Sequence, residues 1–134
     1  MKYLLDTNIC IYLIKQKPRP VLQKFEAHAV GDIGVSAITV AELEFGAQKS
    51  QYPAKNQRAL EQFLIPLAIV DFDYNAAVVY GRLRAELQAQ GTPIGPLDML
   101  IAAQAVSLEV VLVTNNEREF VRVPQLKVVN WVNE

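Results

Sequence analysis

Cysteine and histidine are nearly absent from this sequence, which contains one of each, Cys10 and His28. A single cysteine cannot form an internal disulfide bond. One cysteine and one histidine are also too few for a zinc site or for a Cys/His nucleophile pair. The sequence therefore excludes a disulfide scaffold and a zinc protein, and we expect both residues to be structural.

Long hydrophobic runs are lacking as well. No segment approaches the ~20 uncharged apolar residues that a membrane-spanning helix requires. The N-terminal residues follow a strand pattern with Asp6 inside it, so they lack the apolar stretch of a signal peptide. We expect a soluble protein that is located in the cytoplasm.

The sequence also lacks an excess of charge of either sign. The 134 residues carry 13 basic and 14 acidic side chains, and 51% of them are hydrophobic. This composition excludes disorder and predicts one compact domain over residues 1–134. Near-neutrality argues mildly against a dedicated nucleic-acid-binding domain, because such domains tend to be basic. A carboxylate-rich metal site, however, would mask a basic groove in this sum.

Apolar runs alternate with helical patterns along the whole chain. The runs predict strands at residues 2–6, 32–36, 67–72, 110–114 and 126–131. Between them, the spacing predicts helices at residues 9–15, 20–29, from 37 to near 46–50, 54–65, 74–90 and, after Gly95-Pro96, in 96–109, with a short helical piece in 115–123. Ser36 is expected to cap the helix that follows it, and Gly91 to end the helix before it. Alternating strands and helices indicate a parallel sheet that is covered by helices on both faces.

Polar residues follow several of these strands. Asp6 ends the first strand, Glu42 lies two helical turns after the second, Asp98 opens a buried helix, and Asn115, Asn116 and Glu119 follow the fourth strand. In an open parallel sheet, residues beyond the carboxyl ends of the strands converge on one crevice. Each also has a local explanation: Asp6 as a helix cap, Asp98 as a partner of a helix dipole, and Glu119 in a surface ion pair.

Glu42 is harder to explain locally, because helical spacing places Ile38, Ala41 and Phe45 beside it. An ionised carboxylate near an apolar face requires a partner, a metal ion or a raised pKa. Several carboxylates at one end of a sheet would repel one another unless a cation balanced them. Hard oxygen ligands without paired His or Cys favour Mg²⁺ or Mn²⁺.

Four motifs run in order over nearly the whole chain: LLDTNICIYL, SAITVAELEFGAQKS, GTPIGPLDMLIAAQA and LVTNNEREFVRVPQLKVVNW. With them, the sequence resembles the PIN-domain ribonucleases and, among these, the VapC toxins of bacterial toxin–antitoxin pairs. The resemblance implies a single three-layer α/β/α domain with a mostly parallel sheet of four or five strands. It also implies a Mg²⁺-dependent endoribonuclease, in which Mn²⁺ can substitute.

The resemblance assigns roles to residues of this chain. Asp6 and Asp98 would hold the metal ion, and Glu42 would orient or deprotonate the attacking water or complete the metal shell. Asn116 and Glu119 would position a second metal ion or its waters, since many PIN domains have a further acid where this chain has Asn115 and Asn116. In-line attack would leave a 5′-phosphate and a 3′-hydroxyl. The residues expected to orient the carboxylates are Thr7, Asn8, Thr114 and Asn115.

The resemblance also implies partners. The expected substrate is tRNA, with initiator tRNA cut in its anticodon region, which would inhibit translation. We expect a homodimer that is silenced by a cognate VapB antitoxin in a higher hetero-oligomer, with DNA contacted only through the antitoxin. The antitoxin is expected to place an Arg or similar group on the acids. The apolar residues predicted for an antitoxin or dimer face are Ile11, Ile14, Val21 and Phe25.

An RNA substrate requires cations along its path. The candidates are Lys15, Lys17, Arg19, Arg82, Arg84, Arg118 and Arg122. Any one of them is more often a solvated surface charge, and Glu86 four residues after Arg82 suits a surface ion pair.

Two alternative functions compete with RNA cleavage. A signalling receiver domain also has an Asp at a strand end and binds Mg²⁺, but it needs a pair of acids near the first strand and a Lys after a late one. Asp6 has no acidic neighbour, and LVTNN contains no Lys. A PIN domain that binds RNA or a partner without cutting it is the second alternative. Retained acids at positions 6, 42 and 98 argue against it.

Overall fold

Five parallel strands form the centre of the computed structural model, which describes residues 1–132. The strands are β1 (Tyr3–Leu5), β2 (Ile33–Ser36), β3 (Ala68–Val70), β4 (Val111–Val113) and β5 (Lys127–Val129). Their order in the sheet is β3-β2-β1-β4-β5, and every neighbouring pair is parallel. The predicted parallel sheet is confirmed. The order also differs from the 2-1-3-4-5 order of receiver domains, which removes that alternative.

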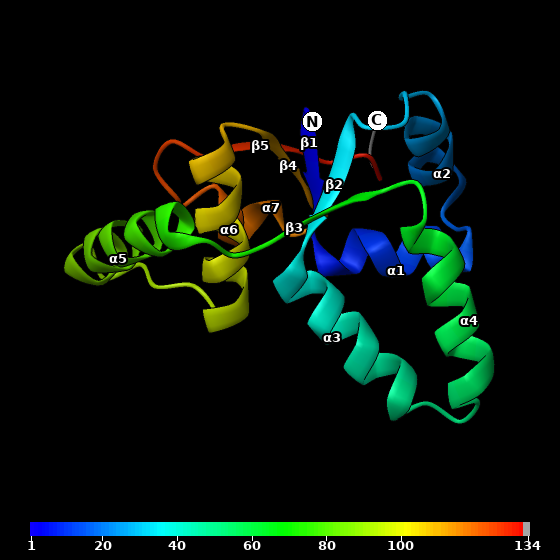
Figure 1. Cartoon of the computed structure of the whole chain (residues 1–134). Helices are drawn as coiled ribbons and strands as arrows, with labels where there is room; N and C mark the ends of the chain where they lie inside the picture. Colours follow the sequence, from blue (N-terminus) through cyan, green and yellow to red (C-terminus); the bar gives the residue numbers. More distant parts are fainter. Residues whose placement is uncertain (133–134) are drawn as a thin grey trace.

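Seven helices connect and cover the strands. They are α1 (Thr7–Lys15), α2 (Arg19–Glu26), α3 (Ala37–Gln48), α4 (Pro53–Leu64), α5 (Tyr74–Ala89), α6 (Pro96–Leu108) and α7 (Glu117–Phe120). Figure 1 shows α5 and α6 on one side of the sheet and α1, α2 and α4 on the other. The predicted three-layer α/β/α arrangement is therefore confirmed.

The two faces of the sheet have separate cores, because successive side chains of a strand point to opposite faces. Leu4 of β1 and Leu112 of β4 pack with the buried residues of α5 and α6. Leu5 and Val113, one position further on, pack with α1 and with Val21, Leu43 and Leu60 of the next three helices. Strands β1 and β4 are thus covered on both faces, as expected for a parallel sheet.

Local signals determine where several helices begin and end. The Ser36 hydroxyl accepts the Ile38 N–H at 3.0 Å and caps α3, as predicted. Gly91, with φ of +70°, follows the last turn of α5 and ends it, also as predicted. Among residues 1–132, no helix has the length and apolar content needed to cross a bilayer.

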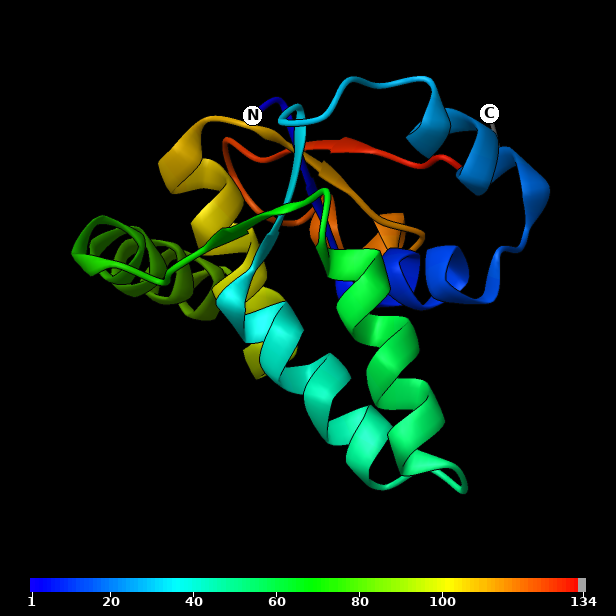
Figure 2. The same ribbon diagram turned by 45° about the vertical axis from the view of Figure 1, so that its right-hand side comes forward.

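Helices α3 and α4 pack against each other as a hairpin that projects away from the sheet (Figures 1 and 2). The turn between them is fixed by side-chain hydrogen bonds. Ser50 donates to the Ala47 carbonyl at 2.6 Å and accepts from Asn56 Nδ2 at 2.8 Å. The hairpin therefore presents its end in a defined conformation.

Candidate active site

Asp6 both caps a helix and lies at the centre of the candidate site. Its Oδ1 accepts the Ile9 N–H at 2.9 Å, and its Oδ2 accepts the Thr114 hydroxyl at 2.5 Å. The residue is only 4% exposed, and burial raises its pKa from 3.8 to about 6, with a smaller contribution from the charge of Glu42. The same carboxylate therefore caps α1 and belongs to the candidate site.

Asp98 lies in the first turn of α6 and faces the other acids. Its pKa is raised from 3.8 to about 6, mainly by burial and then by the charges of Glu119, Asp6 and Glu42, in that order. Carboxylates from three other segments of the chain thus act on Asp98, and Glu42 also acts on Asp6. The structure brings together acids that the sequence analysis expected to converge beyond the carboxyl ends of the strands.

Glu119 connects α7 to the start of α6. Its Oε1 accepts the Gly95 N–H at 2.7 Å, directly before the helix that carries Asp98. Its Oε2 accepts Asn116 Nδ2 at 3.3 Å. Asn116 therefore supports Glu119, which in turn holds the entry of α6 in place.

Glu42 is held from α1, since the Thr7 hydroxyl donates to its Oε1 at 2.8 Å. The sequence argument placed Glu42 beside an apolar face that included Phe45, and this part was wrong. Phe45 is 65% exposed, and the buried residues of α3 are Thr39, Leu43 and Ala47. The carboxylate lies at the edge of the buried face, within reach of α1.

The donor set fits a hard divalent cation. Glu119 lies close enough to Asp98 to raise its pKa, first of all through its charge. A divalent cation between these carboxylates would supply positive charge that offsets their repulsion. Within residues 1–132, no three or more His, Cys, Asp or Glu side chains form a group that could hold a metal ion as they stand.

The residues predicted to orient the carboxylates divide into two groups. Thr7 and Thr114 donate to Glu42 and Asp6, as described above. Within residues 1–132, the side-chain hydrogen bonds of Asn115 go elsewhere, since its Nδ2 donates to the Tyr12 hydroxyl at 3.2 Å and its Oδ1 accepts from Asn130. Asn8 is exposed, and the described part of the chain holds no hydrogen bond of its side chain.

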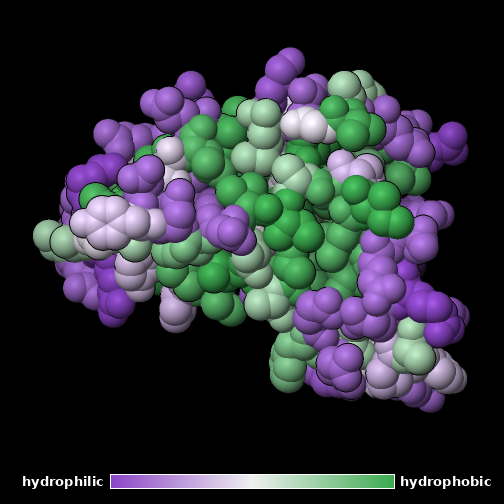
Figure 3. All heavy atoms as spheres, viewed as in Figure 1, coloured by the Kyte–Doolittle hydropathy of each residue, from purple (hydrophilic) through white to green (hydrophobic). Residues whose placement is uncertain are grey.

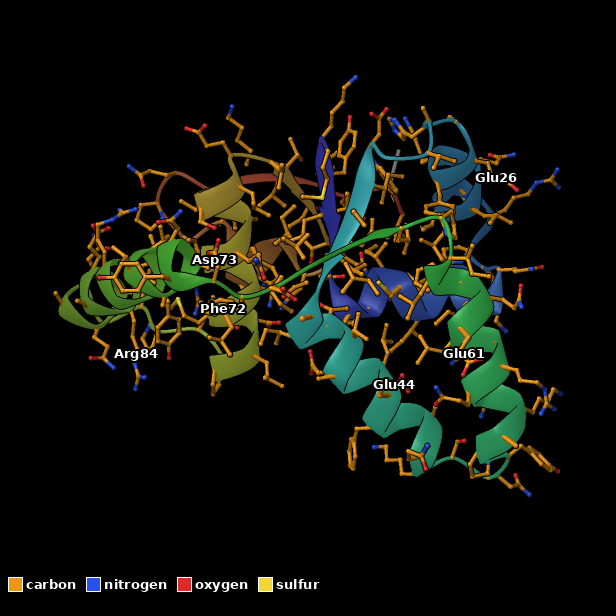
Figure 4. The ribbon with its side chains drawn as sticks, viewed as in Figure 1. Glu26, Glu44, Glu61, Phe72, Asp73 and Arg84 are labelled. Atoms are coloured by element: carbon orange, nitrogen blue, oxygen red, sulfur yellow. The ribbon has the colours of Figure 1, made fainter. Side chains whose placement is uncertain are left out.

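Three of the four arginines predicted to bind RNA have contacts within the protein. Arg82 pairs with Glu86 at 3.5 Å, as its spacing predicted. Arg84, on the outer surface of α5 (Figure 4), donates to the Tyr80 hydroxyl at 2.9 Å. Arg122 donates to the Pro93 carbonyl at 3.2 Å, whereas Arg118 is exposed.

Asn130 is a residue of this region that the sequence analysis missed. It is buried at the end of β5 and uses both amide hydrogens, donating to Asn115 Oδ1 at 3.0 Å and to Glu117 Oε1 at 2.9 Å. Its Oδ1 accepts the Val132 N–H at 2.9 Å. Asn130 thereby fixes the segment that carries Thr114 and Glu119. A polar residue directly after an apolar strand, the signal that selected Asp6, would also have selected it.

We expect Asn130→Asp to lower the rate of RNA cleavage by about 10–100-fold, as for other residues that orient ligands. The new carboxylate would face Glu117 and lose both donated hydrogen bonds. Adding Glu117→Gln restores a donor opposite position 130, so the double variant should recover much of kcat, with Glu117→Gln alone as the control. Unchanged kcat in Asn130→Asp would contradict a positioning role.

The raised pKa values of Asp6 and Asp98 predict how the stability of the metal-free protein depends on pH. Between about pH 4 and pH 6, both carboxyls still hold a proton in the folded protein, whereas the unfolded chain, in which their pKa is 3.8, has released it. The free energy of unfolding should therefore fall as pH rises from about 4 to above 6. Thermal unfolding in EDTA measures this slope, which Asp6→Asn with Asp98→Asn should flatten and Asp71→Asn should not. A stability that rises through this range because of these two residues would contradict the assignment.

Comparison with known proteins agrees with this arrangement. Residues 3–126 match the model of the PIN domain family. The chain therefore belongs to the PIN-domain family.

Similar individual proteins show to which group of PIN domains the chain is related. The chain is 49% identical to Ribonuclease VapC2 of Haemophilus influenzae (98% and 99% of the two chains covered) and 44% identical to the tRNA(fMet)-specific endonuclease VapC of Shigella flexneri (98% of each). It also matches the structure of DNA-bound VapBC from Salmonella typhimurium, with a TM-score of 0.93, 43% identity and 98% of each chain covered. Within the PIN domains, the chain groups with the VapC ribonucleases.

Proposed function

We propose that this protein is the toxin of a VapBC pair and cleaves phosphodiester bonds of RNA with Mg²⁺, which Mn²⁺ can replace. The observation that carries the proposal is the convergence of Asp6, Glu42, Asp98 and Glu119, with Asp98 acted on by the other three. A divalent cation bound by such a cluster would offset the cost of bringing like charges together.

Asp6, Asp98 and Glu119 are the residues that would hold Mg²⁺. The bound ion would polarise the scissile phosphate and lower the pKa of an attacking water. Thr114 and Thr7 keep the carboxylates of Asp6 and Glu42 in fixed orientations. Glu42, held by Thr7, would accept a proton from the attacking water as its oxygen bonds to phosphorus. The P–O3′ bond would break and the departing oxygen would take a proton from solvent, so that the products are a 5′-phosphate and a 3′-hydroxyl.

The proposed substrate is initiator tRNA, cut in its anticodon region in the cytoplasm, with inhibition of translation as the result. The name of the Shigella relative supports this choice, since the chain aligns with 98% of that protein. A PIN domain that only binds RNA is the alternative. The four interacting acids favour cleavage, because carboxylates without a metal ion repel phosphates.

A groove of about 400 Å³ between α1, α3 and α4 fits a partner segment. It begins at Thr7 and Glu42 and is lined by Ile11, Ile14 and Leu43 among others. We propose that VapB binds here and presents a cation to the acids. The VapBC complexes among the similar structures support VapB as the partner. The predicted antitoxin or dimer face is only partly right for this groove. Of its four residues, Ile11 and Ile14 line the groove, whereas Val21 is in the core and Phe25 packs with Phe63.

Exposed apolar side chains support the proposed homodimer. Ile69 on edge strand β3 is 50% exposed, and Tyr74 and Val78 of α5 are 80% and 52% exposed. Figure 3 shows apolar surface across this side of the molecule. Dimers would assemble with VapB into a larger complex, and DNA would be contacted through VapB.

The test is incubation of antitoxin-free protein with a total tRNA pool in Mg²⁺ and in EDTA, with sequencing of the new 5′ ends. We expect cleavage of initiator tRNA in its anticodon region, loss of cleavage in EDTA and recovery on adding Mg²⁺. Binding of tRNA without any cleavage would support the binding-only alternative. Cleavage that persists in EDTA would refute the metal-dependent mechanism.

A further inference from the structure

The end of the α3–α4 hairpin carries positive charge without any acid. Residues 45–60 contain Lys49, Lys55 and Arg58 and no acidic residue, in a protein whose formal net charge is −1. All three cations are exposed. Lys49 lies 5.1 Å from the centre of the Phe45 ring, and no ion pair of the three is recorded within residues 1–132.

The acids of the same two helices do not neutralise these cations. Glu44 and Glu61 lie nearer the sheet (Figure 4), and Gln57 Nε2 donates to both, at 3.2 Å and 3.4 Å. The positive charge at the end of the hairpin is therefore available to an external anion, and Figure 3 shows hydrophilic surface there.

The groove between α1, α3 and α4 connects this end to the acids. Its lining runs from Thr7 and Glu42 to Ser50 and Asn56 in the hairpin turn, with Lys15 on the α1 side. Glu42 and Lys49 are seven residues apart on one helix and its cap, a rise of about 10 Å. A chain of phosphates that reaches the acids can therefore also reach the hairpin cations.

We propose that the end of the α3–α4 hairpin binds the phosphate backbone of the RNA next to the bond that is cut. This inference rests on the proposed function, since it assumes an RNA substrate at the four acids. The acids repel phosphates, so nearby cations must compensate for that repulsion if RNA is to enter. Arg82, Arg84 and Arg122 have contacts within the protein, whereas the hairpin cations have no acidic partner among residues 1–132.

Tyr52 adds a stacking surface at the same place. It is 61% exposed and caps α4 in the turn that Ser50 and Asn56 hold. An unpaired base can stack on such a ring whatever its identity. The hairpin thus combines cations for phosphates with one aromatic face for a base, as expected for binding of a single-stranded loop.

The experiment measures binding of fluorescently labelled bulk tRNA to Asp98→Asn protein over a range of salt concentrations. Because binding is measured without cleavage, failure of this inference and failure of the proposed activity are distinguishable. Replacing Lys49, Lys55 and Arg58 by Gln should weaken binding at least about tenfold at low salt. It should also reduce the slope of log K against log salt by about 2, because each lost phosphate contact contributes 0.7–0.9.

The matched control replaces Lys2 and Lys127 by Gln and is compared with the double replacement of Lys55 and Arg58 by Gln. Both control residues are also exposed; Lys2 lies directly before β1 and Lys127 is the first residue of β5, so they are at the amino ends of the strands, away from the acids. The control should bind almost as well as the parent. Tyr52→Leu should weaken binding severalfold and leave the salt slope unchanged, because stacking releases no counterions.

Three results would overturn the proposal. Equal losses in the hairpin and control variants would show that only total charge matters. An unchanged salt slope in the hairpin variant would show that it makes no phosphate contacts. Weaker binding of VapB with unchanged binding of tRNA would assign the hairpin to the antitoxin instead. Single substitutions of Lys55 and Arg58 by Glu provide the same test if the triple variant is unstable.

Discussion

Asp98→Asn is expected to fold normally and to cleave RNA at least about a thousandfold more slowly, the scale on which loss of an electrostatic group at a reacting centre acts. The amide removes a negative charge that three neighbouring carboxylates oppose and that would otherwise bind Mg²⁺. Stability without metal should rise or stay the same, because like-charge repulsion is relieved. Initial rates on initiator tRNA and thermal unfolding measure the two effects.

Asp71→Asn is the matched control for this prediction. Asp71 is exposed, and its backbone carbonyl, not its carboxylate, accepts the bond from Gln104 at 2.8 Å. Its substitution should leave cleavage unchanged. An Asp98→Asn protein that cleaves at the parental rate would remove Asp98 from the site.

Asp6 should be equally necessary for cleavage, but its two substitutions should differ in stability. Asp6→Asn can still accept the Ile9 N–H and cap α1, whereas Asp6→Ala loses this bond and should cost about 1 kcal/mol. Asn also avoids burying an ionised carboxylate, so near pH 8 its metal-free form should be at least as stable as the parent.

Both Asp6 variants should cleave RNA at least about a thousandfold more slowly than the parent protein. Unfolding curves recorded beside the cleavage assays separate the cap from the chemistry. If Asp6→Asn cleaves normally while Asp6→Ala is inactive and unstable, then Asp6 serves only as a cap and the local explanation is sufficient.

Local chemistry made much of the fold predictable. The hydroxyl of Ser36, the stop at Gly91 and the Arg82–Glu86 pair depend on residues within a few positions of one another, so their spacing along the chain is informative. The alternation of strands and helices then predicted the parallel sheet. Since the carboxyl ends of such strands meet at one edge, it also predicted that Asp6 and Asp98 interact.

Contacts between distant segments were less predictable. The bond from Thr7 to Glu42 spans 35 residues, and those from Asn130 to Asn115 and Glu117 depend on β5 lying beside β4. Strand order and side-chain rotamers decide these pairs, and neither has a local signal. The hydrogen bond from Arg122 to the Pro93 carbonyl was not predicted for the same reason, because no residue near Arg122 in the sequence indicates it.

The most direct test of the account is the location of Mn²⁺ in crystals of the active, antitoxin-free protein, read from its anomalous scattering. We predict a peak between the carboxylates of Asp6 and Asp98, beside Glu119, that is lost in crystals of Asp98→Asn. Saturating Mn²⁺ that supports cleavage in solution but leaves no peak among these side chains would contradict the account.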